Sequence, residues 1–215
     1  MKIAKILSVA LVGGLLVSQT ACGSKNDDNK DGMNDSEAAM SDKDNDAYDS
    51  EEMEEETVKV GGADMYPSKN IIENASNSED HTTLVAAVKA AGLVETLQGA
   101  GPFTVFAPTN KAFDKLPEGT VENLLLPANK AKLTGILTYH VVAGKLDSDQ
   151  LKAMIDAGDG KAELKTVQGG KLWVSKKLNK IILTDEKGET AAIDIDDVYQ
   201  SNGVIHVVDA VLMHK

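Results

Sequence analysis

The sequence predicts an α+β fold in a single domain that spans residues 58–215. Three observations support this prediction. Apolar residues in the first half of the region recur at helical spacing, as Leu84, Val88 and Ala91 do. From about residue 160 onward, apolar and polar residues alternate as in strands, between glycine-containing turns. The region contains no internal repeat, and helices that mostly precede strands favour a segregated arrangement over alternating βαβ units.

The first half of the region opens with a predicted helix and a buried strand. The helix starts near Asp80 or Thr82, either of which can cap it, and runs to Gly99 or Gly101. The apolar run Val105–Ala107 then predicts a strand.

The middle of the region predicts further short helices. Two of them are separated by Pro127 and lead into a strand at 139–142. Another helix follows, with Ser148 as its candidate N-cap and Gly158 at its end.

The last third of the region predicts strands joined by tight turns. A hairpin is expected around Gly169 and Gly170, and a second turn at Lys187 and Gly188. Residues 202–213 are almost continuously apolar and predict a final strand.

The N-terminus has the pattern of a secretory signal peptide over residues 1–21. Lys2 and Lys5 precede a short apolar run, and small residues follow it. Thr20-Ala21-Cys22 resembles the lipobox of bacterial lipoproteins, although Gln19 stands where an aliphatic residue is usual. This resemblance implies that Cys22 is lipidated and anchors the chain to a membrane. The alternative is ordinary cleavage that leaves a free thiol on this sole cysteine.

Residues 22–57 predict an acidic, disordered linker. Positions 23–56 hold fourteen acidic residues and three lysines, whereas 57–215 hold twenty and seventeen. So much like charge with few apolar residues cannot form a core. Asp27, Asn29, Asp31 and Gly32 match the start of a calcium-binding loop, but Ala38 stands where such loops carry a bidentate Glu. Acidic residues after a lipidated cysteine also resemble surface-export signals. A disordered linker is favoured over both a calcium-binding loop and a surface-export signal.

The composition bears on several classes of function. All 22 basic residues are lysine and the formal net charge is −12, which argues against nucleic-acid binding. His206 and Asp209 could belong to a catalytic set, but no nucleophile motif accompanies them. The four histidines have no zinc-ligand spacing, and for Asp194, Asp196 and Asp197 a solvated strand end is favoured over a cation site. We therefore predict no enzyme activity, no cofactor and no metal site.

Three sites in the domain have both a structural and a functional interpretation. The break after the strand at 105–107 favours a fold hinge over a reactive centre, with Thr109 as helix cap and Asn110 bonded to exposed backbone groups. His140 sits in an apolar run, which is typical of a core histidine. Trp173 is either a core residue, which is favoured, or an exposed platform for a sugar ring.

Three stretches together resemble a fasciclin-like domain. They are TVFAPTNKAF at 104–113, TYHVVAGKL at 138–146 and NGVIHVVDAVL at 202–212, in the family's order. The resemblance implies a compact β-rich wedge with short helices packed on one side. It also implies structural roles for Thr109, Asn110, Asn202, Gly203 and His206. The family's Tyr-His adhesion motif corresponds to Tyr139 and His140, which are candidates for partner contact or for holding the fold.

The resemblance implies adhesion as the function. We expect a lipid-anchored module in the cell envelope, on the outer membrane or cell surface and otherwise periplasmic or secreted. Its expected partners are proteins or polysaccharides of the cell surface or matrix. The alternative is a periplasmic protein that binds a small molecule or a lipid, which would require a sizeable apolar pocket.

Overall fold

The computed structural model describes residues 56–215, which belong to one compact unit, Glu51–Lys215. The signal peptide at 1–21, Cys22, nearly all of the linker at 22–57 and its calcium-loop pattern lie outside the described residues. Nothing in the structure bears on these predictions. Within 56–215, none of the helices has the length and apolar character that a membrane crossing demands.

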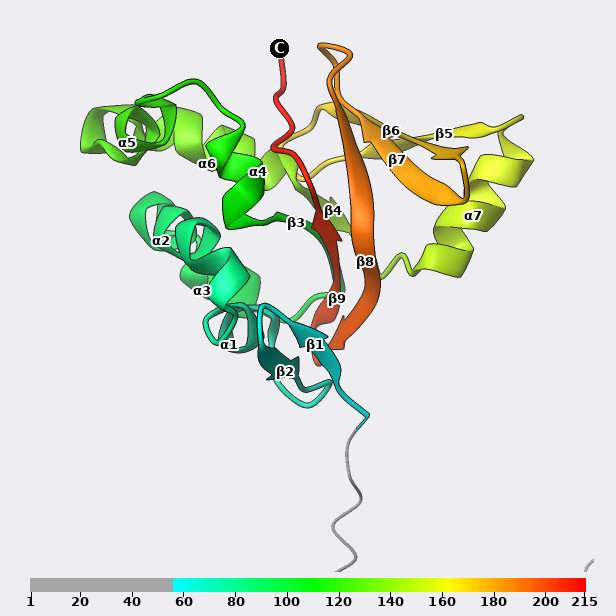
Figure 1. The fold of residues 1–215 in the computed structure, drawn as a ribbon, viewed down its shortest axis with the longest axis horizontal. Coiled ribbons are helices and arrows are strands. Elements are labelled where there is room, and N and C mark those ends of the chain that lie inside the picture. The colour runs from blue at the N-terminus through cyan, green and yellow to red at the C-terminus, as the bar shows by residue number, and fades with distance from the viewer. Residues whose placement is uncertain (1–55) are drawn as a thin grey trace, which may run out of the picture. The chain divides into compact units, whose positions relative to one another are not determined.

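A seven-stranded mixed sheet forms the centre of the fold (Figure 1). Its strand order is β4-β3-β9-β8-β7-β6-β5, and only the β3–β9 pairing among these strands is parallel. A separate hairpin, β1–β2, precedes it. The strand bounds are β1 Val58–Val60, β2 Ala63–Met65, β3 Phe103–Pro108, β4 Val141–Ala143, β5 Lys161–Lys165, β6 Lys171–Lys177, β7 Lys180–Thr184, β8 Thr190–Gln200 and β9 Gly203–Val208.

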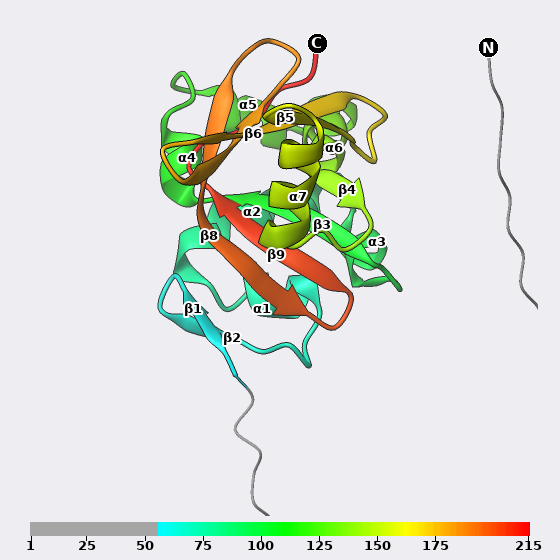
Figure 2. The ribbon, with the colours of Figure 1, turned by 90° about the vertical axis from the view of Figure 1, so that its right-hand side faces the viewer.

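Most of the helices cover one face of strands β3, β4 and β9, whereas α7 lies on the other side of the molecule (Figures 1 and 2). The α+β, β-rich fold predicted from sequence is confirmed. The helix bounds are α1 Ile71–Ala75, α2 Thr82–Ala91, α3 Val94–Gln98, α4 Asn110–Asp114, α5 Thr120–Leu125, α6 Lys130–Tyr139 and α7 Ser148–Ala157, with 3₁₀ turns η1 at Glu79–His81 and η2 at Pro127–Asn129.

Two apolar clusters share the central strands because successive side chains of a strand point to opposite faces. Val105 and Ala107 of β3 join the cluster beneath helices α1–α6. Phe106, between them, joins the cluster that contains Leu151 of α7 and Leu172 of β6. The central strands are therefore buried on both faces, which explains why all six residues of β9 are buried.

Three predicted boundaries are wrong. The helix expected to reach Gly99 is interrupted at Gly92, which ends α2 with φ +74°, a conformation that favours glycine. The N-cap of α7 is Asp147, whose side chain accepts a hydrogen bond from Gln150 N, and not Ser148. The final strand ends at Val208 because its parallel neighbour β3 ends at Pro108.

Candidate functional site

The strands of the first and last fasciclin-like stretches, at 104–113 and 202–212, lie side by side in the sheet. Strands β3 and β9 pair in parallel, from Phe103 opposite Gly203 to Pro108 opposite Val208. Asn110 therefore follows one end of this strand pair, and Asn202 precedes the other end. Each asparagine bonds to the helical layer.

Thr109 and Asn110 form the connection from β3 to α4. The Thr109 hydroxyl accepts a hydrogen bond from Ala112 N at 3.3 Å, which caps α4. Asn110 Oδ1 accepts from Thr83 N at 3.0 Å, and its Nδ2 donates to Glu79 O at 2.8 Å. Asn110 thus satisfies the first turn of α2, where the sequence pointed to Asp80 or Thr82 as the cap.

Asn202 connects the β8–β9 turn to two helices. Its Oδ1 accepts from Ile71 N at the start of α1 at 3.1 Å. Its Nδ2 donates to Leu97 O at 2.8 Å and to Gly99 O at 3.0 Å, at the end of α3. Beside it, a Cβ on Gly203 would lie 2.1 Å from Phe103 O, so a side chain at position 203 would prevent β9 from approaching β3.

Tyr139 is the last residue of helix α6 and not part of a strand, so the predicted strand at 139–142 is wrong over its first two residues. The short apolar run fits either structure, and packing of Leu133, Ile136 and Leu137 extends the helix. Tyr139 is fully buried. Its hydroxyl donates to Lys171 O at 2.6 Å and accepts from Glu186 N at 3.2 Å. Burial raises the pKa of Tyr139 to about 12.

His140 follows α6 and is also buried. Its Nδ1 donates to Ile136 O at 2.9 Å, so Nε2 is free to accept a hydrogen bond from Leu212 N at 3.0 Å. Burial lowers the pKa of His140. Both ring nitrogens thus bond to backbone groups, as expected of a histidine that holds the fold. Contact of Tyr139 or His140 with a partner stays a prediction, and it would require both side chains to leave these bonds.

His206 lies in the middle of β9 with no exposed surface. Its Nε2 donates to Leu146 O at 2.8 Å, and its Nδ1 accepts from Asp197 N at 3.3 Å. The ring stacks on Phe106 with centroids 5.7 Å apart. Asp209 instead accepts from Ala192 N and pairs with Lys115, so His206 and Asp209 bond to different partners.

A model of the fasciclin domain matches residues 79–214 of this chain. The chain belongs to the fasciclin domain family. Protein sll1483 of Synechocystis sp. is 47% identical over 162 residues, which cover 75% of this chain and 83% of that protein. Cell surface glycolipoprotein MPB83 of Mycobacterium bovis is 35% identical over 144 residues, 65% of this chain and 58% of that protein.

A solved structure shares the fold. It is a FAS1 domain pair from the insect cell adhesion molecule fasciclin I, with a TM-score of 0.62 at 17% identity. The match covers 69% of this chain and 52% of that chain. At this identity the likeness is one of fold.

Two aspartates that hold the fasciclin domain together were not recognised from sequence as structural residues. Asp197, at φ +56°, accepts from Ser148 N at 2.7 Å and from the Ser148 hydroxyl at 2.5 Å. Asp185 is buried and accepts from Glu189 N and from Met213 N, both at 2.8 Å. A turn signal around Asp185 is visible in the sequence, but its bond to Met213 is set by tertiary structure.

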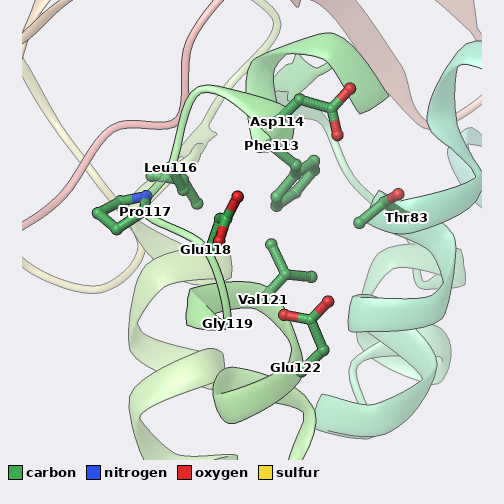
Figure 3. Close-up of a pocket in the computed structure, with 9 residues that line it drawn as sticks. All are labelled: Thr83, Phe113, Asp114, Leu116, Pro117, Glu118, Gly119, Val121 and Glu122. Carbon is green, nitrogen blue, oxygen red and sulfur yellow. The ribbon is translucent and has the colours of Figure 1, made fainter.

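An acidic pocket of about 300 Å³ opens between α2, α4 and α5 of the fasciclin domain (Figure 3). Phe113 and Val121 lie toward its interior, with the carboxylates of Glu118 and Glu122 close by. Its lining is Thr83, Phe113, Asp114, Leu116, Pro117, Glu118, Gly119, Val121 and Glu122. Among residues 56–215, no group of three or more histidine, cysteine or carboxylate side chains is placed to hold a metal ion.

Proposed function

We propose that this chain is a lipid-anchored, extracytoplasmic adhesion or binding module that contacts proteins or polysaccharides of the cell surface or matrix. Membership of the fasciclin domain family carries the proposal. The names of two similar proteins support it, because one is a cell surface glycolipoprotein and the other a cell adhesion molecule.

Cys22 and the segment after it supply the anchor and the tether in this proposal. A lipidated Cys22 holds the chain at a membrane without a spanning helix. The segment at 23–56 holds fourteen acidic residues and three lysines, and in this proposal it is the tether between the lipid anchor and the fasciclin domain. This arrangement suits contact with external polymers or neighbouring cells.

The alternative, a carrier of a lipid or small molecule, requires an apolar cavity large enough for the ligand. The apolar cavity between the helical layer and β3 has a volume of about 30 Å³. It is lined by residues such as Leu84, Val88 and Val105. Pockets for drug-sized ligands are roughly ten times larger. This cavity is therefore too small to support the alternative.

Protease treatment of intact cells tests the proposal. We expect the wild-type domain, detected with an antibody against residues 57–215, to disappear from intact cells. The Cys22→Ser variant should be released from membranes. Protection of the wild-type domain until the outer envelope is opened would place it in the periplasm and would contradict surface display. Membrane retention of Cys22→Ser would contradict the lipid anchor.

A further inference from the structure

Positive charge in the fasciclin domain is concentrated in strands β5–β7. Residues 161–184 contain six lysines and a single acidic residue, Glu163, whereas 57–215 as a whole contain seventeen lysines and twenty acidic residues. A basic stretch within an otherwise acidic domain creates a local surface of opposite sign.

Strand alternation places most of these lysines on one surface. Leu164, Leu172 and Leu183 are buried in the cluster shared with α7, which lies on that side of the strands (Figure 1). The residues that alternate with them point away from α7. We call this outward surface of β5–β7 the lysine face, and it comprises Lys161, Glu163, Lys165, Lys171, Trp173, Lys177 and Lys180.

The lysine face contains two pairs of directly opposed like charges. Lys165 pairs with Lys171 across β5–β6, and Lys177 pairs with Lys180 across β6–β7. Like charges at such positions destabilise a sheet. Lys171 and Lys180 are partly neutralised by Glu163 at 3.1 Å and Asp194 at 2.9 Å.

Lys165 and Lys177 are exposed and have no carboxylate within 4.0 Å among the described residues. Their charges therefore add repulsion without a compensating bond in the fold. An anionic ligand would remove that repulsion.

Trp173 lies at the centre of this face. The preference for a core position is wrong, because Trp173 is only partly buried and points away from the core between the fully buried Leu172 and Val174. Lys161 Nζ lies 4.9 Å from the ring centroid. Its neighbours are Ser175 along β6, Thr184 across to β7 and Glu163 across to β5, and the Glu163 carboxylate is paired with Lys171. An aromatic ring beside hydroxyls and ammonium groups can contact the apolar face, the hydroxyls and the carboxylates of a sugar acid.

We propose that the lysine face binds an anionic polysaccharide, with its carboxylates at Lys165 and Lys177 and a sugar ring against Trp173. From Lys171 to Lys177 the outward residues of β6 cover roughly 20 Å at about 3.3 Å per residue, which suits an extended polymer. Each lysine ammonium is a compact point charge that can attract a carboxylate, so lysines along the strands suit carboxylates spaced along a chain. The inference rests on the proposed function and specifies its partner.

An anionic membrane is the competing partner. Leu178, in the β6–β7 turn next to Lys177, is 93% exposed and could insert into a bilayer. The polysaccharide is favoured because Lys165 and Lys171 lie at the end of the β5–β6 pair far from this turn, with Trp173 between them and Lys177, and a single leucine is a weak anchor.

Calorimetric titration of the full chain with polygalacturonate tests the proposal, with the emission of Trp173 as a second readout because it is the chain's sole tryptophan. We expect binding that weakens with salt and changes Trp173 emission. The double variant Lys165→Gln/Lys177→Gln should lose at least about fivefold in affinity, a loss consistent with two exposed charge contacts. The matched control is Lys89→Gln/Lys132→Gln, two exposed lysines on α2 and α6, and should bind like the wild type.

Two results would overturn the proposal. One is polygalacturonate affinity that is equal in the two double variants. The other is that the chain does not bind polygalacturonate but does bind phosphatidylglycerol vesicles, and that Leu178→Ser abolishes the vesicle binding. That result would assign the lysine face to a membrane. Neutral dextran should produce no signal. If the polysaccharide proposal fails, the proposal of surface display still stands, because protease accessibility of the domain does not depend on which ligand it binds.

Discussion

The hydroxyl of Tyr139 bridges the start of β6 and the β7–β8 turn, through Lys171 O and Glu186 N. Tyr139→Phe removes this hydroxyl and leaves both backbone groups without that partner in a partly buried place. We expect the free energy of unfolding to fall by about 1–3 kcal/mol, measured by urea denaturation.

Tyr199→Phe is the control for this loss, since Tyr199 is 38% exposed. Its stability should stay within about 0.5 kcal/mol of the wild type. Equal stability of the Tyr139→Phe variant and the wild type would show that the bridge contributes nothing.

Three buried histidines make stability depend on pH. Burial lowers the pKa of His81, His140 and His206 below the ordinary value of 6.5. The unfolded chain therefore binds more protons than the folded chain just below pH 6.5. The free energy of unfolding should be insensitive to these groups above that pH and should decrease as the pH falls, until the folded-state pKa values are passed. Each histidine contributes a slope of at most about 1.4 kcal/mol per pH unit.

Denaturant titrations at several pH values between 7.5 and 5 would measure this slope. For His140 the charge of Asp185 opposes the effect of burial, and burial is the larger influence. His140→Gln should have a shallower slope than the wild type, whatever its absolute stability. Identical slopes would mean that His140 titrates alike in the folded and unfolded chains.

At the scale of elements, the parallel pair β3–β9 is fastened to the helical layer at both ends by asparagine side chains. Asn110→Ala removes the bonds to Thr83 N and Glu79 O and leaves the start of α2 without its cap. We expect a loss of about 1–2 kcal/mol in the free energy of unfolding, with faster amide exchange in the first turn of α2.

Asn77→Ala is the matched control, because Asn77 is exposed and its side chain makes none of these bonds. It should unfold like the wild type. Loss of stability without any change in exchange at α2 would argue that Asn110 acts elsewhere.

Sequence reasoning succeeded for these elements where the determining interactions are local. Thr109 caps a helix three residues away, and Gly169 and Gly170 mark a hairpin turn. It missed the cap of α2 because Asn110 lies 27 residues away from Thr83. The bond from Asn202 to Ile71, 131 residues away, depends on strand pairing that no local pattern specifies.

Within the described region, key side chains of the three fasciclin-like stretches are buried, whereas the lysine face is exposed. Phe106, Tyr139 and His206 are fully buried, and their polar atoms bond within the chain. The lysine face is exposed, basic and repulsive to itself. Periodicity identified the alternation of β5–β7, but whether a helix covers the outward residues depends on where α7 packs. In the fold these hallmark side chains bond internally, and β5–β7 is the surface that we propose for contact with a partner.

Carbodiimide cross-linking of the full chain to oligogalacturonate, followed by mass spectrometry, tests this division most directly. The reaction joins a lysine amine to a carboxylate only when the two are in contact. We predict that cross-links concentrate at Lys161, Lys165 and Lys177 and decrease at high salt. Cross-links spread evenly over the exposed lysines, or concentrated on lysines outside β5–β7, would contradict the account.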